Sequence, residues 1–433
     1  MPRQINHHVI ATVTVVSCFV FFSAGANATS DPESDKRTIS LREAVTKTIT
    51  GNPDLRAFDY RLKAQDGRVQ QAGLAPSPEL NVLLEDALGT GNHKGFDNAQ
   101  ATISISWILE RGLRQRYVDT ARAGLSLFSV EAGIKQLDAA AETARRYLVS
   151  LAFQARRVNA DKTVQLAKAT IAAVQKRVRA GKAPEAELFR AQAELARRKL
   201  EREHIDHERV SANRRLAAQW GETELTFSRV AGDITSLPQL ASFGTLKSQL
   251  QQNPEFIRLL SNRRLKKAEL QLALARDKPS WRVNAGMRHT QEDSNNNSQA
   301  LIAGISIPFG QRTRNPGRIA EARANLAETH LAETATRIRA ETILSVLYEK
   351  LQHDMHVINA VRNDIIPPLE KALTETRRAY NLGRYSYLEW RSVQAELLDA
   401  HNALIEASVN AQRNIIEIER LTGVRIAQPI TRP

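Results

Sequence analysis

The chain has 433 residues, only 5% of them aromatic, and a formal net charge of +14. With 20 Gly and 15 Pro over this length, the composition favours long helices over several compact cores. Lys and Arg alternate with Glu and Asp at helical spacing and form no basic block, so the charge favours solvated helix surfaces over a nucleic-acid partner.

Residues 1–28 have the pattern of a secretory signal peptide. Arg3 gives a positive start, residues 9–22 form an apolar run, and Ala26-Asn27-Ala28 is a small-residue cleavage pattern. The mature chain is therefore expected to be exported. The single cysteine, Cys18, lies inside the apolar run, so we expect neither disulfides nor a lipid anchor.

No later stretch has the roughly 18 consecutive apolar residues that a spanning helix needs. Export without an anchor leaves two classes open. The chain is either a soluble extracytoplasmic protein or an outer-membrane protein built on strands.

The first half, residues 29–225, reads as one structural repeat. A helix opens at Ser40, which has the capping-box acid Glu43 three residues later, and a second helix starts near Asn52-Pro53. The spacing of apolar residues then changes from the helical period of 3.6 residues to the strand period of 2, which predicts a strand hairpin at about 79–109. Residues 113–179 contain no proline and predict a helix on the order of 100 Å long, which must pack as a coiled coil.

The second half, residues 243–425, repeats this order about 200 residues later. A polar loop at 291–298 divides its strand hairpin, at about 281–308. The helix turns, or tips, fall at about 179–187 and 381–389, with Gly181 aligned with Gly383 and Glu187 aligned with Glu389. Such a period indicates a duplicated domain. Residues 226–242 then form an equatorial linker and 426–433 a C-terminal tail.

Two further features concern the long helices. Pro367-Pro368 occurs only in the second copy and predicts a kink there. Each return helix is about half as long as its partner, so we expect the short helix before each strand hairpin to stack end to end with it.

The predicted fold is mainly α with a small β part: long helical hairpins in two tandem repeats, plus four strands. Four strands cannot close a membrane barrel, which needs about eight, so they form a soluble sheet or share a barrel with other chains. Side chains alternate between the two faces of a strand, and this alternation places Arg282 and Arg288 on the face that would line a barrel, making its lumen partly basic. A shift of the strand register by one residue would reverse the assignment. The lipid-facing candidates on the other face are Ile103, Ile105, Trp107, Val283, Ile305 and Ile307.

Several motifs together resemble the TolC family of outer-membrane efflux channels over about residues 39–425. They are LREAV at 41–45, NPDL at 52–55, QAGLAPSPEL at 71–80 and the two glycine-centred tips. The third motif, with NPGRIAEA at 315–322, is similar to the CzcC-type branch that serves heavy-metal pumps. Trp107-Ile108 and the stretch RGLR at 111–114 depart from that branch.

The resemblance implies a homotrimer with a twelve-stranded barrel in the outer membrane and a helical tunnel in the periplasm. It also implies a periplasmic adaptor (membrane fusion) protein, an inner-membrane resistance-nodulation-division pump and divalent cobalt, zinc or cadmium ions as cargo. A drug or organic-solute channel of the same family is the first alternative. A soluble extracytoplasmic coiled-coil scaffold is the second.

The resemblance also assigns roles at the tips. It implies that Glu389, six residues after Gly383, lines a periplasmic gate, where three copies would favour cations. Ser392 takes the place of a second acid, and Glu187 is either a counterpart of Glu389 or a solvated glutamate favoured by its helix dipole. Tip residues expected to contact the adaptor are Gly181, Lys182, Gly383 and Arg384.

No catalytic motif or cofactor-binding motif is present, so the chain is not expected to be an enzyme. Two His pairs, His204 with His207 and His353 with His356, have the i, i+3 spacing of metal ligands. Neither recurs in the other repeat or has a third ligand nearby in the sequence. Solvated helix faces are therefore expected, and no metal site.

Overall fold

The computed structural model describes residues 37–110, 112–238, 241–292, 296–308 and 315–423. The signal-peptide pattern at 1–28 and the tail at 426–433 lie outside these residues. The described part falls within one compact unit that begins at Arg37. Its elements are mostly helical, with four long strands, as the sequence predicts.

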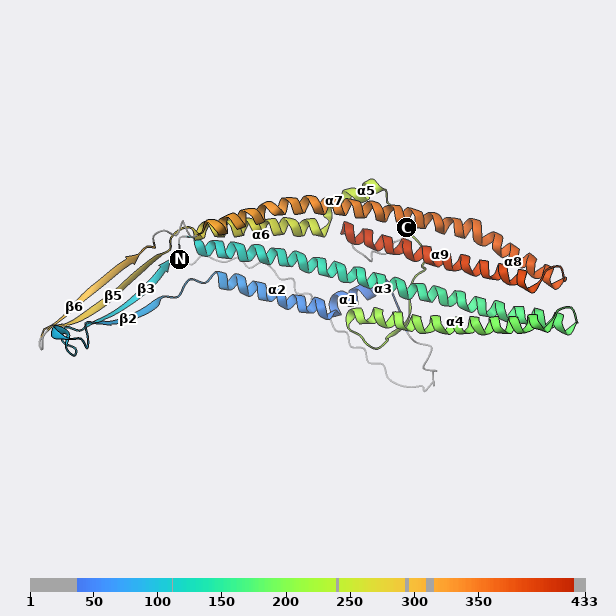
Figure 1. The fold of residues 1–433 in the computed structure, drawn as a ribbon, viewed down its shortest axis with the longest axis horizontal. Helices are drawn as coiled ribbons and strands as arrows, with labels where there is room; N and C mark the ends of the chain where they lie inside the picture. Colours follow the sequence, from blue (N-terminus) through green and yellow to red (C-terminus); the bar gives the residue numbers. More distant parts are fainter. Residues whose placement is uncertain (1–36, 111, 239–240, 293–295, 309–314, 424–433) are drawn as a thin grey trace, which may run out of the picture. The chain divides into compact units, whose positions relative to one another are not determined.

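Helices and strands follow the same order in both halves (Figure 1). The first half contains α1 (Leu41–Gly51), α2 (Pro53–Ala72), β2 (Glu79–Glu85), β3 (Gln100–Leu109), α3 (Leu113–Arg179) and α4 (Glu185–Ala217). The second contains α5 (Phe243–Gln249), α6 (Pro254–Arg276), β5 (Trp281–Glu292), β6 (Asn296–Ser306), α7 (Pro316–Ala360), α8 (Ile366–Asn381) and α9 (Tyr387–Thr422). The polar loop expected at 291–298 is shorter, because β5 and β6 continue into it.

The helices pack around α3, which contacts α2 and α4 on one side and α6 and α9 on the other. Helix α7 packs in turn against α6 and α9, and α8 against α9. The strands lie at one end of these helices and the turns α3–α4 and α8–α9 at the other (Figure 1). No helix in the described part of the chain is both long and apolar enough to cross a membrane.

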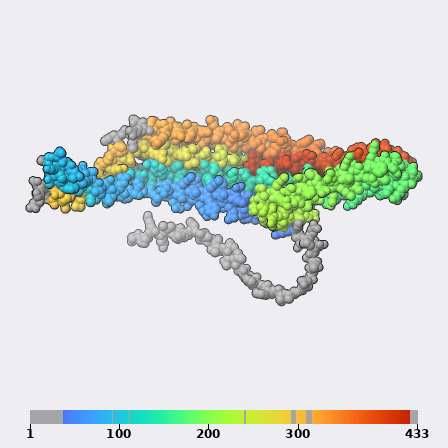
Figure 2. Space-filling model, turned by 60° about the horizontal axis from the view of Figure 1, so that its bottom comes forward, coloured from blue at the N-terminus to red at the C-terminus, as the bar shows by residue number. Residues whose placement is uncertain are grey.

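The short helices do stack on the return helices. Asn52 caps α2 by accepting from the Asp54 N–H at 2.9 Å, and its amide donates to the Gln219 carbonyl at 2.7 Å. In the second half, Asn253 accepts from the Glu255 N–H and donates to the Leu421 carbonyl. One Asn side chain thus joins two helix ends in each half. In Figure 2 the blue surface of α2 continues into the green surface of α4.

The four-stranded sheet is antiparallel throughout, in the order β2-β3-β5-β6. On its polar face the side chains of the inner strand β3 are buried, with Thr102 4% and Ser104 7% exposed, whereas Leu83 on the edge strand β2 is 50% exposed. Its apolar face is open, with Ile103 56% and Leu301 86% exposed. This is the reverse of a sheet in a water-soluble protein, where the apolar face is the covered one.

Gly286 lies opposite Ser104 on the polar face. A Cβ at Gly286 would clash with the Ile103 carbonyl and with Ser104. Glycine is needed here because β3 and β5 approach closely on this side of the sheet.

The structure contains a two-stranded parallel sheet that was not predicted from the sequence. It joins β1 (Arg37–Ile39), from the stretch before the first helix, to β4 (Phe227–Val230), from the equatorial linker. The Tyr147 hydroxyl on α3 lies within hydrogen-bonding distance of the Ile39 carbonyl (3.1 Å) and the Ala231 carbonyl (2.5 Å). Strands this short carry no detectable period, and only tertiary contacts bring them together.

The predicted interruption of the second long helix is confirmed. Helix α7 ends at Ala360, a π-helical turn spans Val361–Ile365, and α8 begins at Ile366. Pro367 and Pro368 have no N–H to donate to the preceding turn, so the regular hydrogen-bond pattern fails there.

Candidate functional site: the helix tips and the polar faces

A buried aromatic cluster holds the two helix tips together. It contains Val174, Ala191, Tyr380, Tyr387 and Trp390, each no more than 3% exposed. The Tyr380 and Trp390 rings lie 5.1 Å apart. Because these residues come from α3, α4, α8 and α9, the cluster fixes the first hairpin against the second.

Both tips turn through the same glycine motif. Gly181 has φ 68° and Gly383 φ 80°, and in each tip the residue after the glycine donates its N–H to a carbonyl five residues earlier. This is the Schellman ending of a helix, which favours glycine because its left-handed backbone carries no Cβ penalty. The predicted adaptor-contacting residues Gly181, Lys182, Gly383 and Arg384 are all exposed.

Arg177 and Tyr380 connect the tips in a way that the sequence analysis missed. The Arg177 guanidinium lies over the Tyr380 ring, 4.5 Å from its centroid, and donates to the carbonyls of Tyr380 and Lys182. The Tyr380 hydroxyl donates to Glu187 at 2.8 Å. Burial and the adjacent Glu187 carboxylate raise the pKa of Tyr380, so the hydroxyl stays protonated as a donor.

Glu389 has a different environment from its sequence counterpart Glu187. Its carboxylate accepts from the Ser386 N–H at 2.6 Å, and the Ser386 hydroxyl accepts from the Glu389 N–H at 3.3 Å, completing a capping box. The Ser386 backbone bond lowers the pKa of the exposed Glu389 carboxyl, which therefore stays ionised. Glu187 is instead bonded across the tips to Tyr380.

Ser392 and Arg391, the neighbours of Glu389 on α9, have other partners. The Ser392 hydroxyl donates to Glu396 at 3.1 Å, and Arg391 lies 3.4 Å from Glu194 on α4. The Arg391 charge is therefore directed toward Glu194, and Glu389 keeps its own charge at the start of the helix.

The polar face of the sheet is balanced in charge. Arg282 pairs with Glu79 at 3.3 Å, and Arg288 pairs with Glu85 at 3.5 Å and donates to Thr102. Both arginines lie on the face opposite the exposed apolar side chains. Each arginine charge is therefore offset by a glutamate partner across the sheet, and the placement of Arg282 and Arg288 in a lumen stays a prediction.

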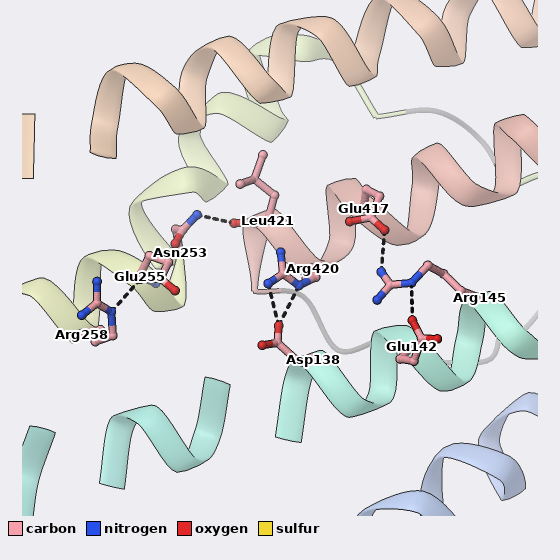
Figure 3. A network of polar contacts seen from close by, with 9 residues as sticks. All are labelled: Asp138, Glu142, Arg145, Asn253, Glu255, Arg258, Glu417, Arg420 and Leu421. Carbon is pink, nitrogen blue, oxygen red and sulfur yellow. Dashed lines mark hydrogen bonds and ion pairs between the residues drawn. The ribbon is translucent and has the colours of Figure 1, made fainter. Parts of the chain in front are cut away.

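A second set of ion pairs connects the two repeats halfway along the helices (Figure 3). Asp138 on α3 lies 2.6 Å from Arg420 on α9, and Arg145 on α3 bridges Glu142 (2.9 Å) and Glu417 (2.6 Å). Nearby, Asp354 on α7 accepts from Asn414 on α9, and burial raises its pKa. Acids and bases alternate across these helices, so no purely acidic surface forms here.

The His pairs do not gather further ligands. His204, His207, His353 and His356 are all exposed. Within the described residues, no group of three or more His, Cys, Asp or Glu side chains is placed to hold a metal ion.

Comparison with known proteins gives a family match over the first half of the chain. Residues 44–222 match the family model described as outer membrane efflux protein. The chain is also 24% identical, over 387 residues, to the cobalt-zinc-cadmium resistance protein CzcC of Cupriavidus metallidurans, covering 89% of this chain and 90% of CzcC. Residues 44–222 therefore match the outer membrane efflux protein family, and the similarity to CzcC extends over both halves of the chain. It acts in the outer membrane as an efflux channel component and not as an enzyme.

Solved structures share the fold of this outer membrane efflux protein. A membrane protein from Pseudomonas aeruginosa has a TM-score of 0.74 at 16% identity, covering 88% of this chain and 90% of its own. CusC, whose structures concern folding and transmembrane channel formation, has a TM-score of 0.71 at 16% identity, with 88% and 91% covered. The tandem hairpins and the four-stranded sheet are therefore a fold that this chain shares with these solved membrane proteins.

Proposed function

We propose that the protein is the trimeric exit channel of a tripartite efflux pump that exports divalent heavy-metal cations such as cobalt, zinc or cadmium. The observation that carries the cargo assignment is the similarity to a cobalt-zinc-cadmium resistance protein over about nine-tenths of both chains. The partners would be a periplasmic adaptor protein at the tips and an inner-membrane resistance-nodulation-division pump.

The sheet supports a shared barrel. Its apolar face is open, and strands β2 and β6 are left as edges. In hydrocarbon, an unpaired strand edge is not viable, because no water satisfies its backbone groups. Three copies would pair these edges into twelve strands, with lipid on the apolar side and Arg282 and Arg288 in the lumen.

The tips support a gate with a cation preference. The exposed, ionised Glu389 lies in the first turn of α9, and Tyr380 ties the tips together through Glu187. In a trimer, three Glu389 carboxylates would attract cations at the periplasmic end. The adaptor would act on the exposed turns at Lys182 and Arg384.

A second cargo class, organic solutes, is favoured by one observation. The ion pairs on the polar face of the sheet and between α3 and α9 neutralise the acids that form them, whereas an acidic conduit would favour divalent cations more strongly. Both cargoes use the same channel, and a cellular experiment separates them.

The test is deletion of the gene followed by complementation with the full chain. Heavy-metal export predicts that deletion sensitises cells to zinc, cobalt or cadmium more than to dyes or antibiotics, and that complementation restores resistance. The opposite ranking would assign the organic cargo.

A further inference from the structure

A cavity of about 210 Å³ lies between α5, α7 and α9. Its walls are largely apolar, with Leu246 from α5, Leu351 and Met355 from α7, and Ile418 from α9. Among the described side chains that line it, Glu419 is the single ionisable residue. The cavity therefore combines one carboxyl group with a hydrocarbon surface.

Glu419 differs from its neighbours on α9 because its carboxylate has no partner. Glu417 and Arg420 form ion pairs with α3, but in the described part of the chain no hydrogen bond or ion pair reaches the Glu419 carboxylate. Its backbone carbonyl accepts from the Gly423 N–H and from the Thr422 hydroxyl at 3.3 Å. Burial raises the pKa of Glu419 to about 7, with no nearby charge opposing the shift.

We propose that this cavity is a binding site for a small organic monocation, an ammonium group carried on an aromatic or alkyl body. A partly buried carboxylate without a partner, set among apolar walls, is poorly stabilised, and an ammonium donor would both neutralise it and satisfy its oxygens. The apolar walls would hold the organic part of the ligand. A cavity of roughly 150 Å³ is known to take benzene, so this one is large enough for a ring with a short amine.

A metal ion fits this site poorly. Divalent cations take several oxygen or nitrogen ligands, whereas this cavity offers one carboxylate, with Gln249 and Thr422 as its other polar side chains. The Thr422 hydroxyl already donates to the Ile418 carbonyl. The site is separate from the tips and the sheet, so the proposal does not depend on which cargo the channel exports.

The experiment uses the full mature chain in detergent with benzylammonium as the probe, observed by ligand NMR. Benzyl alcohol, of nearly the same shape but neutral, is the matched ligand. We expect benzylammonium to bind at least about tenfold more tightly than benzyl alcohol, as a charge-assisted hydrogen bond provides. Binding should tighten from about pH 6 to about pH 8, because Glu419 ionises in that range.

Two variants complete the test. Glu419→Gln keeps the shape and should reduce benzylammonium binding to the level of benzyl alcohol. Glu406→Gln removes an exposed carboxylate from the same helix and should change nothing. Equal binding of the two probes to the unaltered chain would overturn the proposal without relying on any variant. Stronger binding after removal of residues 424–433, which include Arg425, would also overturn it, because the chain's own end would then be the occupant.

Discussion

The side-chain amide of Asn253 donates to the backbone carbonyl of Leu421 at 2.8 Å, while its oxygen caps helix α6 (Figure 3). One residue therefore stabilises the start of α6 and the end of α9. Gly423, with φ 74°, lies beside this joint, and a Cβ there would come within 2.9 Å of the Gln252 carbonyl. The joint makes α6 and α9 continue as one line of packing against α3 and α7.

Replacement of Asn253 tests this joint. Asn253→Asp keeps the oxygen that caps α6 and loses the donor to Leu421, whereas Asn253→Ala loses both. We expect thermal unfolding followed by circular dichroism to show a cost of about 1 kcal/mol for the Asp variant and about 2 kcal/mol for the Ala variant. Equal melting temperatures for the two variants would show that the Leu421 bond contributes nothing.

Removal of one hydroxyl should loosen the tips. Tyr380→Phe keeps the aromatic packing against Trp390 and deletes the bond to Glu187. We expect the channel to show a larger conductance or to open more often in planar bilayers, since one hydrogen bond between the hairpins is lost. Tyr385→Phe, at an exposed tyrosine of the same tip, is the control and should behave like the unaltered channel. Identical currents for both variants would place the constraint elsewhere.

Glu389 should give the channel a cation preference that resists acid. Its folded pKa lies below the ordinary value of 4.5, so the charge and its capping bond persist at acidities where a free glutamate becomes protonated. Reversal potentials in a salt gradient should show cation preference lost only as the pH falls through that lowered pKa. Glu389→Ala should lack the preference at every pH.

Two comparisons make the Glu389 measurement decisive. Glu185→Gln removes another first-turn acid at the tips, on α4, and should leave selectivity nearly unchanged. Unaltered selectivity in Glu389→Ala would locate the filter at another level of the channel.

Because strands β3 and β5 approach closely at Gly286, we expect a larger side chain at this position to impair assembly of the protein in the outer membrane. Gly286→Ala places a methyl group against the Ile103 carbonyl and Ser104, so the sheet must open between β3 and β5. We expect strongly reduced recovery from the outer-membrane fraction. Gly244→Ala, where a Cβ meets nothing within 4 Å, is the matched control. Normal recovery of Gly286→Ala would show that the strands adjust.

The sequence by itself determined the elements that depend on local periodicity. The long helix at Leu113–Arg179, the alternating strands, the duplicated order and the interruption before Pro367 all follow from spacing, proline and glycine within a few residues. The resemblance of the motifs was enough to indicate the family.

Tertiary structure alone decided which polar side chains meet between distant segments. Glu187 and Glu389 align in the two repeats, yet Glu187 bonds Tyr380 and Glu389 caps its own helix, because residues 193 positions apart meet at the tips. The same holds for the glutamates that neutralise Arg282 and Arg288, for the β1–β4 pair and for the unpaired Glu419. Each depends on contacts between distant segments, and no period within a single helix or strand encodes them.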